Sequence, residues 1–391
     1  MQQRLIQAFI FAALFVCIQP KSEANKRTFK PCSKDAPKDM VCVPGGQYIR
    51  GSNRNAQHKK WQMRAESPRH AVTLNTFYVD KYEVTNEQYI QCMKAGHCKP
   101  PAYWAIIGGS FWKRFRSPKR PFVRATWFLA HQYCKWAGKR LLTEAEWEAA
   151  ARGPKGDTYP WGNQPPDCTK ANYRAFPPHT SYPAYRKMRF CPNPKANTKK
   201  LFLHGQDQTW PVGISPPFRG IYDMAGNGYE WVQDFYDPHA YAGCDDPNDK
   251  NCPRINPKGP CDGKPSKLCF EKKKVRWFWK KTRKRITLRK GKKRTVRYQT
   301  TYTRVRKVYK RPRRVRYKKR ILKGGSWWWY ADKMRAAYRR ADGPYTGTHR
   351  LSIRCGSSTP IIKRLPPTGK SYKIPQRAPR KKKKRPKRRR R

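Results

Sequence analysis

The chain has 391 residues, enough to bury a core in one large domain or two modest ones. Aromatic residues make up 13% of it, including 14 Trp, which excludes a disordered chain in spite of a mean hydropathy of −1.01. Its 90 Lys and Arg stand against 24 Asp and Glu, and an excess of this size predicts an acidic partner.

The N-terminal segment has the pattern of a secretory signal. Arg4 precedes an unbroken apolar run over residues 8–18, and small residues follow at the cleavage positions of residues 22–24. We therefore expect a signal peptide over residues 1–24 and a secreted or periplasmic protein. The apolar run is shorter than the ~20 residues that a membrane-spanning helix needs. We expect no transmembrane segment in the chain that remains after the signal peptide is removed. Lipid attachment at Cys17 is the alternative, although a bulky residue precedes it.

The cysteine spacing predicts a disulfide framework. Loss of the signal peptide removes Cys17 and leaves an even number of cysteines, which in an exported chain is typical of disulfides. Zinc is the alternative, but the chain has no CxxC pair. Ten of the remaining cysteines form couples that are close in the sequence: Cys32/Cys42, Cys92/Cys98, Cys168/Cys191, Cys244/Cys252 and Cys261/Cys269.

Regular elements are short and are marked by capping signals. Capping boxes at Thr85 and Thr143 predict two helices that end at Gly96 and Gly153. Apolar residues at helical spacing predict a third helix over residues 127–136. Strands are expected around residues 71–74 and 77–79, and the Pro- and Gly-rich remainder predicts long irregular stretches.

Two blocks of the chain concentrate the positive charge. Residues 271–320 hold 26 Lys or Arg and a single acid, Glu271, and residues 376–391 hold 12 more within a basic tail over 358–391. Large and charged residues alternate at period two over 296–299 and 302–306, which predicts a β-ribbon. Disorder is the alternative for this basic insertion.

Seven short motifs follow one another over residues 43–357. They are VPGG at 43–46, FYVDKYEVTNEQY at 77–89, YCKWAGKRL at 133–141, YPWGN at 159–163, YDMAGN at 222–227, GGSW at 324–327 and the Arg354-Cys355 pair. In this order they resemble the formylglycine-generating enzyme (sulfatase-modifying factor) family. This resemblance implies an α+β fold related to C-type lectins, with little regular secondary structure and, here, a basic β-ribbon-like insertion. It also implies a disulfide between Cys134 and Cys355.

The resemblance also implies structural calcium. Asp223 and Glu230 fall on the side-chain ligand positions, with Gly226 and Gly228 on the backbone-carbonyl positions. Hard oxygen donors of this kind suit calcium. An exposed acidic loop is the alternative. A second family site would use Asn172 and the carbonyl of Tyr173, but His204 falls near the place of its carboxylate.

The family's catalytic chemistry is not expected here. Catalytic members oxidise a sulfatase cysteine with two copper-binding cysteines after the GGS motif, and those positions read Trp329 and Met334. Soft thiolates suit Cu(I), so copper is not expected. Ser326 is retained. The segment Trp327, Trp328, Trp329 and Tyr330 would line the groove and could stack on a ligand, because alternation in an extended chain turns at least one Trp outward. Core packing is the alternative.

These features favour an exported, non-catalytic binding protein. The partner would be an acidic polysaccharide, lipopolysaccharide or another polyanion. Two other functions remain open: an oxidase of the formylglycine-generating type, and an extracellular nucleic-acid binder, since aromatic residues interleaved with Arg suit single strands.

Overall fold

The computed structural model describes ten ranges of the chain. The predicted signal peptide with Cys17, the histidine at 204, Cys261 and the basic residues 376–391 lie outside them. The described residues are 29–53, 65–101, 115, 117–175, 189–191, 209–248, 252–260, 269–290, 293–360 and 362–369.

The three predicted helices are confirmed, and their caps explain their bounds. They are α2 (Asn86–Lys94), α4 (Trp127–Trp136) and α5 (Glu144–Arg152). Thr85 and Thr143 each close a full capping box, in which the threonine hydroxyl accepts from the third backbone N–H of the helix. Helix α5 ends where Gly153 takes a φ of 67°, a conformation that favours glycine.

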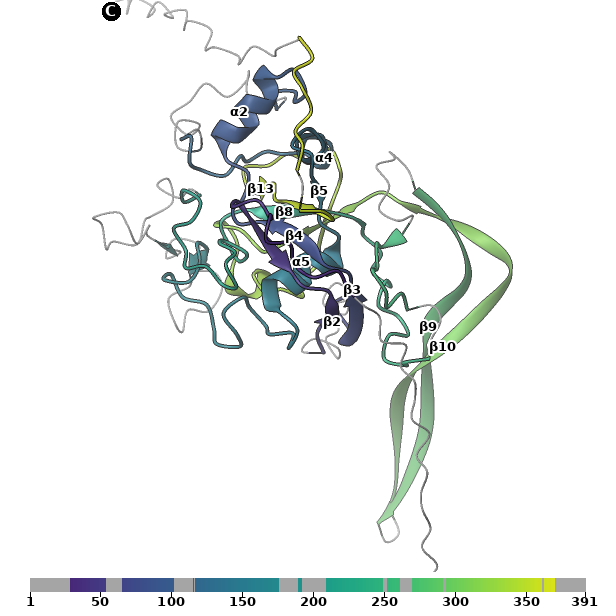
Figure 1. The fold of residues 1–391 in the computed structure, drawn as a ribbon. Helices are drawn as coiled ribbons and strands as arrows, with labels where there is room; N and C mark the ends of the chain where they lie inside the picture. Colours follow the sequence, from purple (N-terminus) through teal and green to yellow (C-terminus); the bar gives the residue numbers. More distant parts are fainter. Residues whose placement is uncertain are drawn as a thin grey trace, which may run out of the picture.

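Two four-stranded sheets form the centre of the domain (Figure 1). The first has the order β1-β4-β14-β5 and the second the order β12-β11-β8-β13; in the second, β13 pairs with β8 in parallel. Helix α5 packs against β8 and β11 of the second sheet and against two further strands, β2 and β3. The strands are β1 (Met40–Val43), β4 (Phe77–Asp80), β14 (Cys355–Ser357), β5 (Arg140–Leu141), β12 (Arg340–Asp342), β11 (Arg320–Lys323), β8 (Tyr229–Phe235) and β13 (Leu351–Ser352).

Three two-stranded ladders surround these sheets. The first pairs β2 (Gly46–Arg50) with β3 (His70–Leu74), and the second pairs β6 (Arg174–Ala175) with β7 (Arg189–Phe190). The third is the predicted ribbon, β9 (Cys269–Lys290) against β10 (Lys293–Tyr317). Its antiparallel register runs from Lys293 opposite Lys290 to Tyr317 opposite Cys269.

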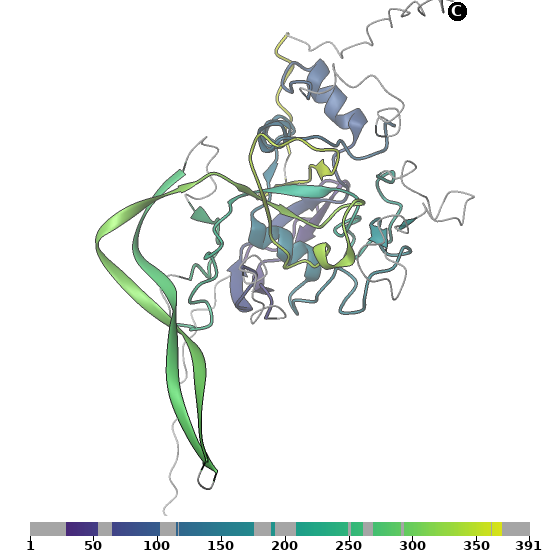
Figure 2. The ribbon, with the colours of Figure 1, turned by 180° about the vertical axis from the view of Figure 1, so that it is seen from behind.

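The ribbon extends away from the sheets as a long, bent and twisted arm (Figures 1 and 2). The structure ends the ribbon a few residues earlier than the boundary at residue 320 that the basic composition predicted. Lys318 and Lys319 are exposed, but Arg320, inside the predicted insertion, begins β11 and is completely buried. The guanidinium of Arg320 lies 3.8 Å from the ring centre of Trp127, so this residue belongs to the core.

Disulfides join the irregular segments to this core. Cys134 and Cys355 are linked across 221 residues, as the family resemblance implied, and this bond ties α4 to β14. Four of the five sequence-local couples are confirmed, and the fifth includes Cys261, outside the described residues. The fold is therefore the expected disulfide-bonded α+β domain with few regular elements. No helix among the described residues has the length and apolar character needed to cross a membrane.

Candidate functional site

The segment after β11 carries the predicted ligand-binding residues. Gly324 and Gly325 have φ values of 90° and 79°, and a Cβ on Gly325 would come within 2.8 Å of Met334. The chain turns sharply there, and the Trp327 amide donates to the carbonyl of Asn227 at 3.0 Å. The Trp329 amide donates to the Ser326 carbonyl at 2.9 Å. The segment is thus a turn and not an extended strand, so the expected alternation of sides does not apply.

The turn divides the aromatic residues into two groups. Trp327 is fully buried and packs with Phe115 and Phe190, so core packing is correct for this residue. Ser326 is also fully buried, and its hydroxyl has no hydrogen-bond partner among the described residues. Trp328, Trp329 and Tyr330 are only partly buried.

Arginine side chains lie over the partly buried rings. Arg174 lies 5.1 Å from the ring centre of Trp328 and 5.6 Å from that of Tyr330. Arg340 and Arg350 each lie 5.4 Å from the ring centre of Trp329. We call these three rings and three arginines the aromatic–arginine cluster. It offers flat apolar faces beside guanidinium groups, a combination suited to anionic sugars.

Met334 and Trp329, which the sequence predicted at the positions of the family's catalytic cysteines, lie in different surroundings. Met334 is fully buried against Trp210 and Ala225, and Trp329 belongs to the aromatic–arginine cluster. The ten cysteines whose side chains the structure describes are all in disulfides. His349, beside Trp327 and Trp328, has its pKa lowered to about 4 by burial and by nearby arginines, so its imidazole is neutral at pH 7.

The predicted calcium loop lies between β8 and β4 and is rich in buried carboxylates. Asp223, Glu230 and Glu83 are all buried, and Asp223 has a φ of 57°. One oxygen of Asp223 accepts from the Gly213 amide at 2.9 Å, and the other has no partner among the described residues. Glu230 accepts from Trp147 Nε1 at 2.5 Å and from Arg354 Nε at 2.8 Å.

The charges around this loop do not balance. Three carboxylates surround one guanidinium, that of Arg354. Burial raises the pKa of Asp223, Glu230 and Glu83, and the charges of the other two carboxylates raise the pKa of Glu83 further. A divalent cation would offset the two uncompensated charges and would give the unpartnered oxygen of Asp223 a ligand. Asp223 and Glu230 offer oxygen donors of the type that calcium takes, and both Glu230 oxygens already accept hydrogen bonds, from Trp147 and Arg354.

Such an ion would depend on backbone oxygens as well as side chains. Within the described ranges, one group of three potential metal-binding side chains has ligand atoms within 4.8 Å of one another: His70, Cys244 and Cys252, whose sulfurs are in a disulfide. At the weaker second site, the Asn172 amide donates to Asn227 at 3.2 Å and the Tyr173 hydroxyl to the Pro166 carbonyl at 2.9 Å.

Sequence reasoning missed the arginines of the cluster and the acid Glu83. Glu83 and Arg354 lie within motifs that were recognised, so their charge inside apolar segments was a usable signal. Arg174, Arg340 and Arg350 come from three separate segments, and nothing in the sequence indicates that they meet at one turn.

The fold, the Gly-Gly-Ser turn and the carboxylate loop together define the class of protein: a domain of the formylglycine-generating type. Residues 25–358 match the family model of the Sulfatase-modifying factor enzyme 1-like domain, and the chain belongs to this family.

Three relatives illustrate the range of the similarity. The formylglycine-generating enzyme of Thermomonospora curvata is 28% identical over 264 residues, covering 58% of this chain and 79% of the relative. That of Streptomyces coelicolor is 30% identical over 262 residues, covering 57% and 75%. The inactive Cα-formylglycine-generating enzyme 2 of Mus musculus is 28% identical over 238 residues, covering 51% and 70%.

Proposed function

We propose that this protein is an exported, non-catalytic member of its family that binds acidic polysaccharides through its basic ribbon, with lipopolysaccharide and other polyanions as related partners. The observation that carries the proposal is the ribbon itself. Twenty-six of the fifty residues at 271–320 are basic, and 23 of these lie at 271–317, where β9 and β10 form an arm that extends from the domain (Figure 2).

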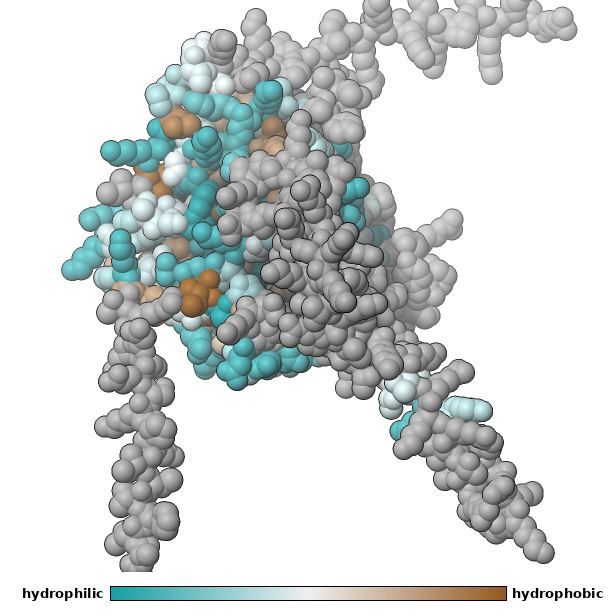
Figure 3. Space-filling view, turned by 90° about the vertical axis from the view of Figure 1, so that its right-hand side faces the viewer, coloured by the Kyte–Doolittle hydropathy of each residue, from teal (hydrophilic) through white to brown (hydrophobic). Residues whose placement is uncertain are grey.

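Charge repulsion makes the free arm unfavourable without counterions. A single acid, Glu271, cannot neutralise the segment, and an isolated two-stranded ribbon is only marginally stable. A polyanion that displaces the counterions gains their release, so its affinity falls as salt rises. Where Figure 3 colours the domain on the ribbon's side, its surface is largely hydrophilic, with small separate apolar patches.

The aromatic–arginine cluster supports an anionic sugar as the repeating unit of the polymer. Trp328 and Tyr330 are half-buried aromatic rings, and the buried Arg174 guanidinium lies over one face of each. Sugar rings stack on such faces, and guanidinium groups bind sulfate or carboxylate in a bidentate way. The ribbon would supply most of the affinity and the cluster would select the sugar.

Three further considerations support an exported, non-catalytic role. Disulfides persist in oxidising compartments, in line with the predicted signal peptide. Trp329 and Met334 offer no thiolate for copper, and one relative carries the word inactive in its name. Calcium at Asp223 and Glu230, with the carbonyls of Gly226 and Gly228, would act as a structural ion that holds the loop together.

The test replaces residues 272–317 with a short Gly-Ser turn, which retains both Cys269 and the buried Arg320. A second variant keeps the ribbon but changes its Lys and Arg to Gln, which separates charge from length. Both should lose most of their heparin affinity and most of its salt dependence. Unchanged heparin binding in both would refute the proposal, and preferential binding of single-stranded DNA would identify a nucleic-acid partner instead.

Catalysis is tested separately. The full-length protein, copper, oxygen and a cysteine-containing sulfatase peptide are incubated together, and the peptide is examined for an aldehyde. We expect none. Any aldehyde that depends on the protein would contradict the non-catalytic assignment.

A further inference from the structure

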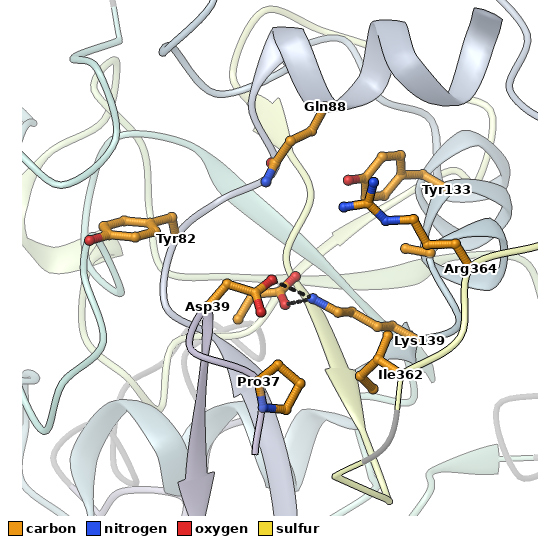
Figure 4. A pocket seen from close by; sticks show the side chains of 10 residues that line it. Pro37, Asp39, Tyr82, Gln88, Tyr133, Lys139, Ile362 and Arg364 are labelled. Carbon is orange, nitrogen blue, oxygen red and sulfur yellow. Dashed lines mark hydrogen bonds and ion pairs between the residues drawn. The ribbon is translucent and has the colours of Figure 1, made fainter. Parts of the chain in front are cut away.

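A pocket of about 230 Å³ lies away from the Gly-Gly-Ser turn, among residues to which no function has been given (Figure 4). Helices α2 and α4, strand β4, the N-terminal lead and the segment 362–369 all contribute to its walls. Its volume suits a ligand smaller than a typical drug molecule.

One wall comes from outside the family domain. Segment 362–369 follows residue 358, where the family match ends, and backbone hydrogen bonds fix it on the helices. The Leu365 amide donates to the Trp136 carbonyl at 2.9 Å, and the Thr368 amide donates to the Ala95 carbonyl at 3.0 Å. The Arg364 guanidinium lies 5.3 Å from the ring centre of Trp136. Arg364 is therefore held in place at the pocket.

Hydrogen-bond donors gather on this side of the pocket. Arg364 has no salt bridge among the described residues, and Figure 4 shows its guanidinium beside Tyr133, with Gln88 on the neighbouring wall. The side-chain oxygen Oε1 of Gln88 accepts from the backbone N–H of Thr85 at 2.9 Å. The side-chain NH₂ of Gln88 is left for a ligand. A guanidinium, an amide and a phenol together suit a carboxylate.

Carboxylates lie on the opposite side. Asp80 and Asp39 share one ammonium, that of Lys139, at 2.5 and 3.1 Å. The Asp80 side chain is 11% exposed and the Asp39 side chain 57%, so Asp39 keeps an open face. Two carboxylates with one ammonium leave a single negative charge, which suits a ligand ammonium group.

We infer that this pocket binds a small zwitterion of the α-amino acid type. Its carboxylate would contact Arg364, Gln88 and Tyr133, and its ammonium group would contact Asp39. The charged lining residues, two acids and two bases, sum to zero, and a zwitterion preserves that balance. An anion alone would leave one uncompensated negative charge in the pocket, and a cation alone one uncompensated positive charge.

The test compares L-alanine with two analogues that each lack one charge, propionate and L-alaninamide, as stabilisers of the full-length protein. At saturating concentration L-alanine should raise the melting temperature by roughly 2 °C or more, and the analogues should have little effect. Arg364→Gln and Asp39→Asn should remove the shift. Lys155→Gln, which changes an exposed charge outside the pocket, is the matched control and should retain it.

The absence of a shift with L-alanine would overturn the inference, as would an equal shift in Arg364→Gln. An equal response to propionate would show an anion site and would overturn the zwitterion assignment. The pocket does not involve β9 or β10, so the protein with the replaced ribbon should respond to L-alanine like the full-length chain. The outcome of the L-alanine test is therefore independent of the polyanion proposal.

Discussion

The globular domain and the ribbon both contain many Arg and Lys residues, but they treat these charges in opposite ways. In the domain, five buried arginines pair with buried glutamates, and the buried Arg174 and Arg320 lie against aromatic rings. In the ribbon, Glu271 is the single acid among the 23 bases of residues 271–317. Basic residues therefore contribute to folding in the domain, and in the ribbon we propose that they bind a partner. The buried pairs are Arg50 and Arg339 with Glu144, Arg152 with Glu148, Arg335 with Glu66 and Arg354 with Glu230.

The largest expected effect breaks the compensation within the domain. Glu144 is fully buried and lies 2.5 Å from Arg50, 2.7 Å from Arg339 and 3.6 Å from Lys323. Glu144→Gln would leave these cations without their shared anion, so the free energy of unfolding should fall by about 3–5 kcal/mol in chemical denaturation. Asp167→Asn, at a largely exposed pair with Lys170, should cost less than about 1 kcal/mol. Equal effects of the two substitutions would contradict the comparison.

The second prediction concerns a buried acid that lacks a full set of partners. Burial and the charge of Glu144 raise the pKa of Asp234 to about 7. Folding thus favours the protonated form, and this contribution to stability is present below about pH 4 and is lost as the pH rises to about 7. Asp234→Asn should remove that pH dependence and stabilise the protein at pH 8 by roughly 2–4 kcal/mol. A loss of stability at pH 8 would show that the ionised carboxylate is needed.

The third prediction concerns calcium at the carboxylate loop. EDTA should lower the stability of the protein, by about 2.7 kcal/mol if the free ion is at a hundred times its dissociation constant. Asp223→Ala should reproduce this loss and abolish the response to EDTA, whereas Asp223→Asn keeps an oxygen ligand and should retain part of it. Without calcium, stability should fall as the pH rises, because burial raises the pKa of Asp223. If EDTA and Asp223→Ala both leave the melting temperature unchanged, the site does not exist.

The smallest expected effect concerns an aromatic residue of the ribbon. Tyr298 on β10 is 63% exposed and has no core to stabilise. Tyr298→Ala should leave unfolding unchanged but weaken heparin binding by about 1 kcal/mol at every salt concentration, because stacking does not depend on counterions. Thr301→Ala, at an exposed position of the same strand, is the control. A change in the salt dependence of Tyr298→Ala would assign it an electrostatic role.

Local signals in the sequence predicted the regular elements well. Thr85, Thr143 and Gly153 marked helix ends because capping depends on neighbouring residues. The period-two pattern predicted the ribbon for the same reason. Sequence-local cysteine couples were equally accessible, whereas the bond between Cys134 and Cys355 needed the family resemblance.

Contacts between distant segments were beyond the sequence. Composition placed Arg320 in the basic insertion, although it is a core residue beside Trp127. The expected alternation of side chains between two faces does not hold at Trp327, because Gly324 and Gly325 turn the chain just before it. The aromatic–arginine cluster combines residues separated by more than a hundred positions, and the pocket at Arg364 needs a segment beyond the family domain. The composition shows that basic residues are in excess, but it does not show which arginines pair with an acidic side chain.

The most direct test of the contrast between domain and ribbon measures stability and heparin affinity in the same two proteins, the full-length chain and the variant whose residues 272–317 are replaced. We expect the same denaturation midpoint for both, because the paired charges of the domain are untouched, together with a steep fall of log affinity against log salt in the full-length protein alone. An unchanged salt slope in the replaced variant, with its domain intact, would show that the ribbon is not the polyanion-binding element.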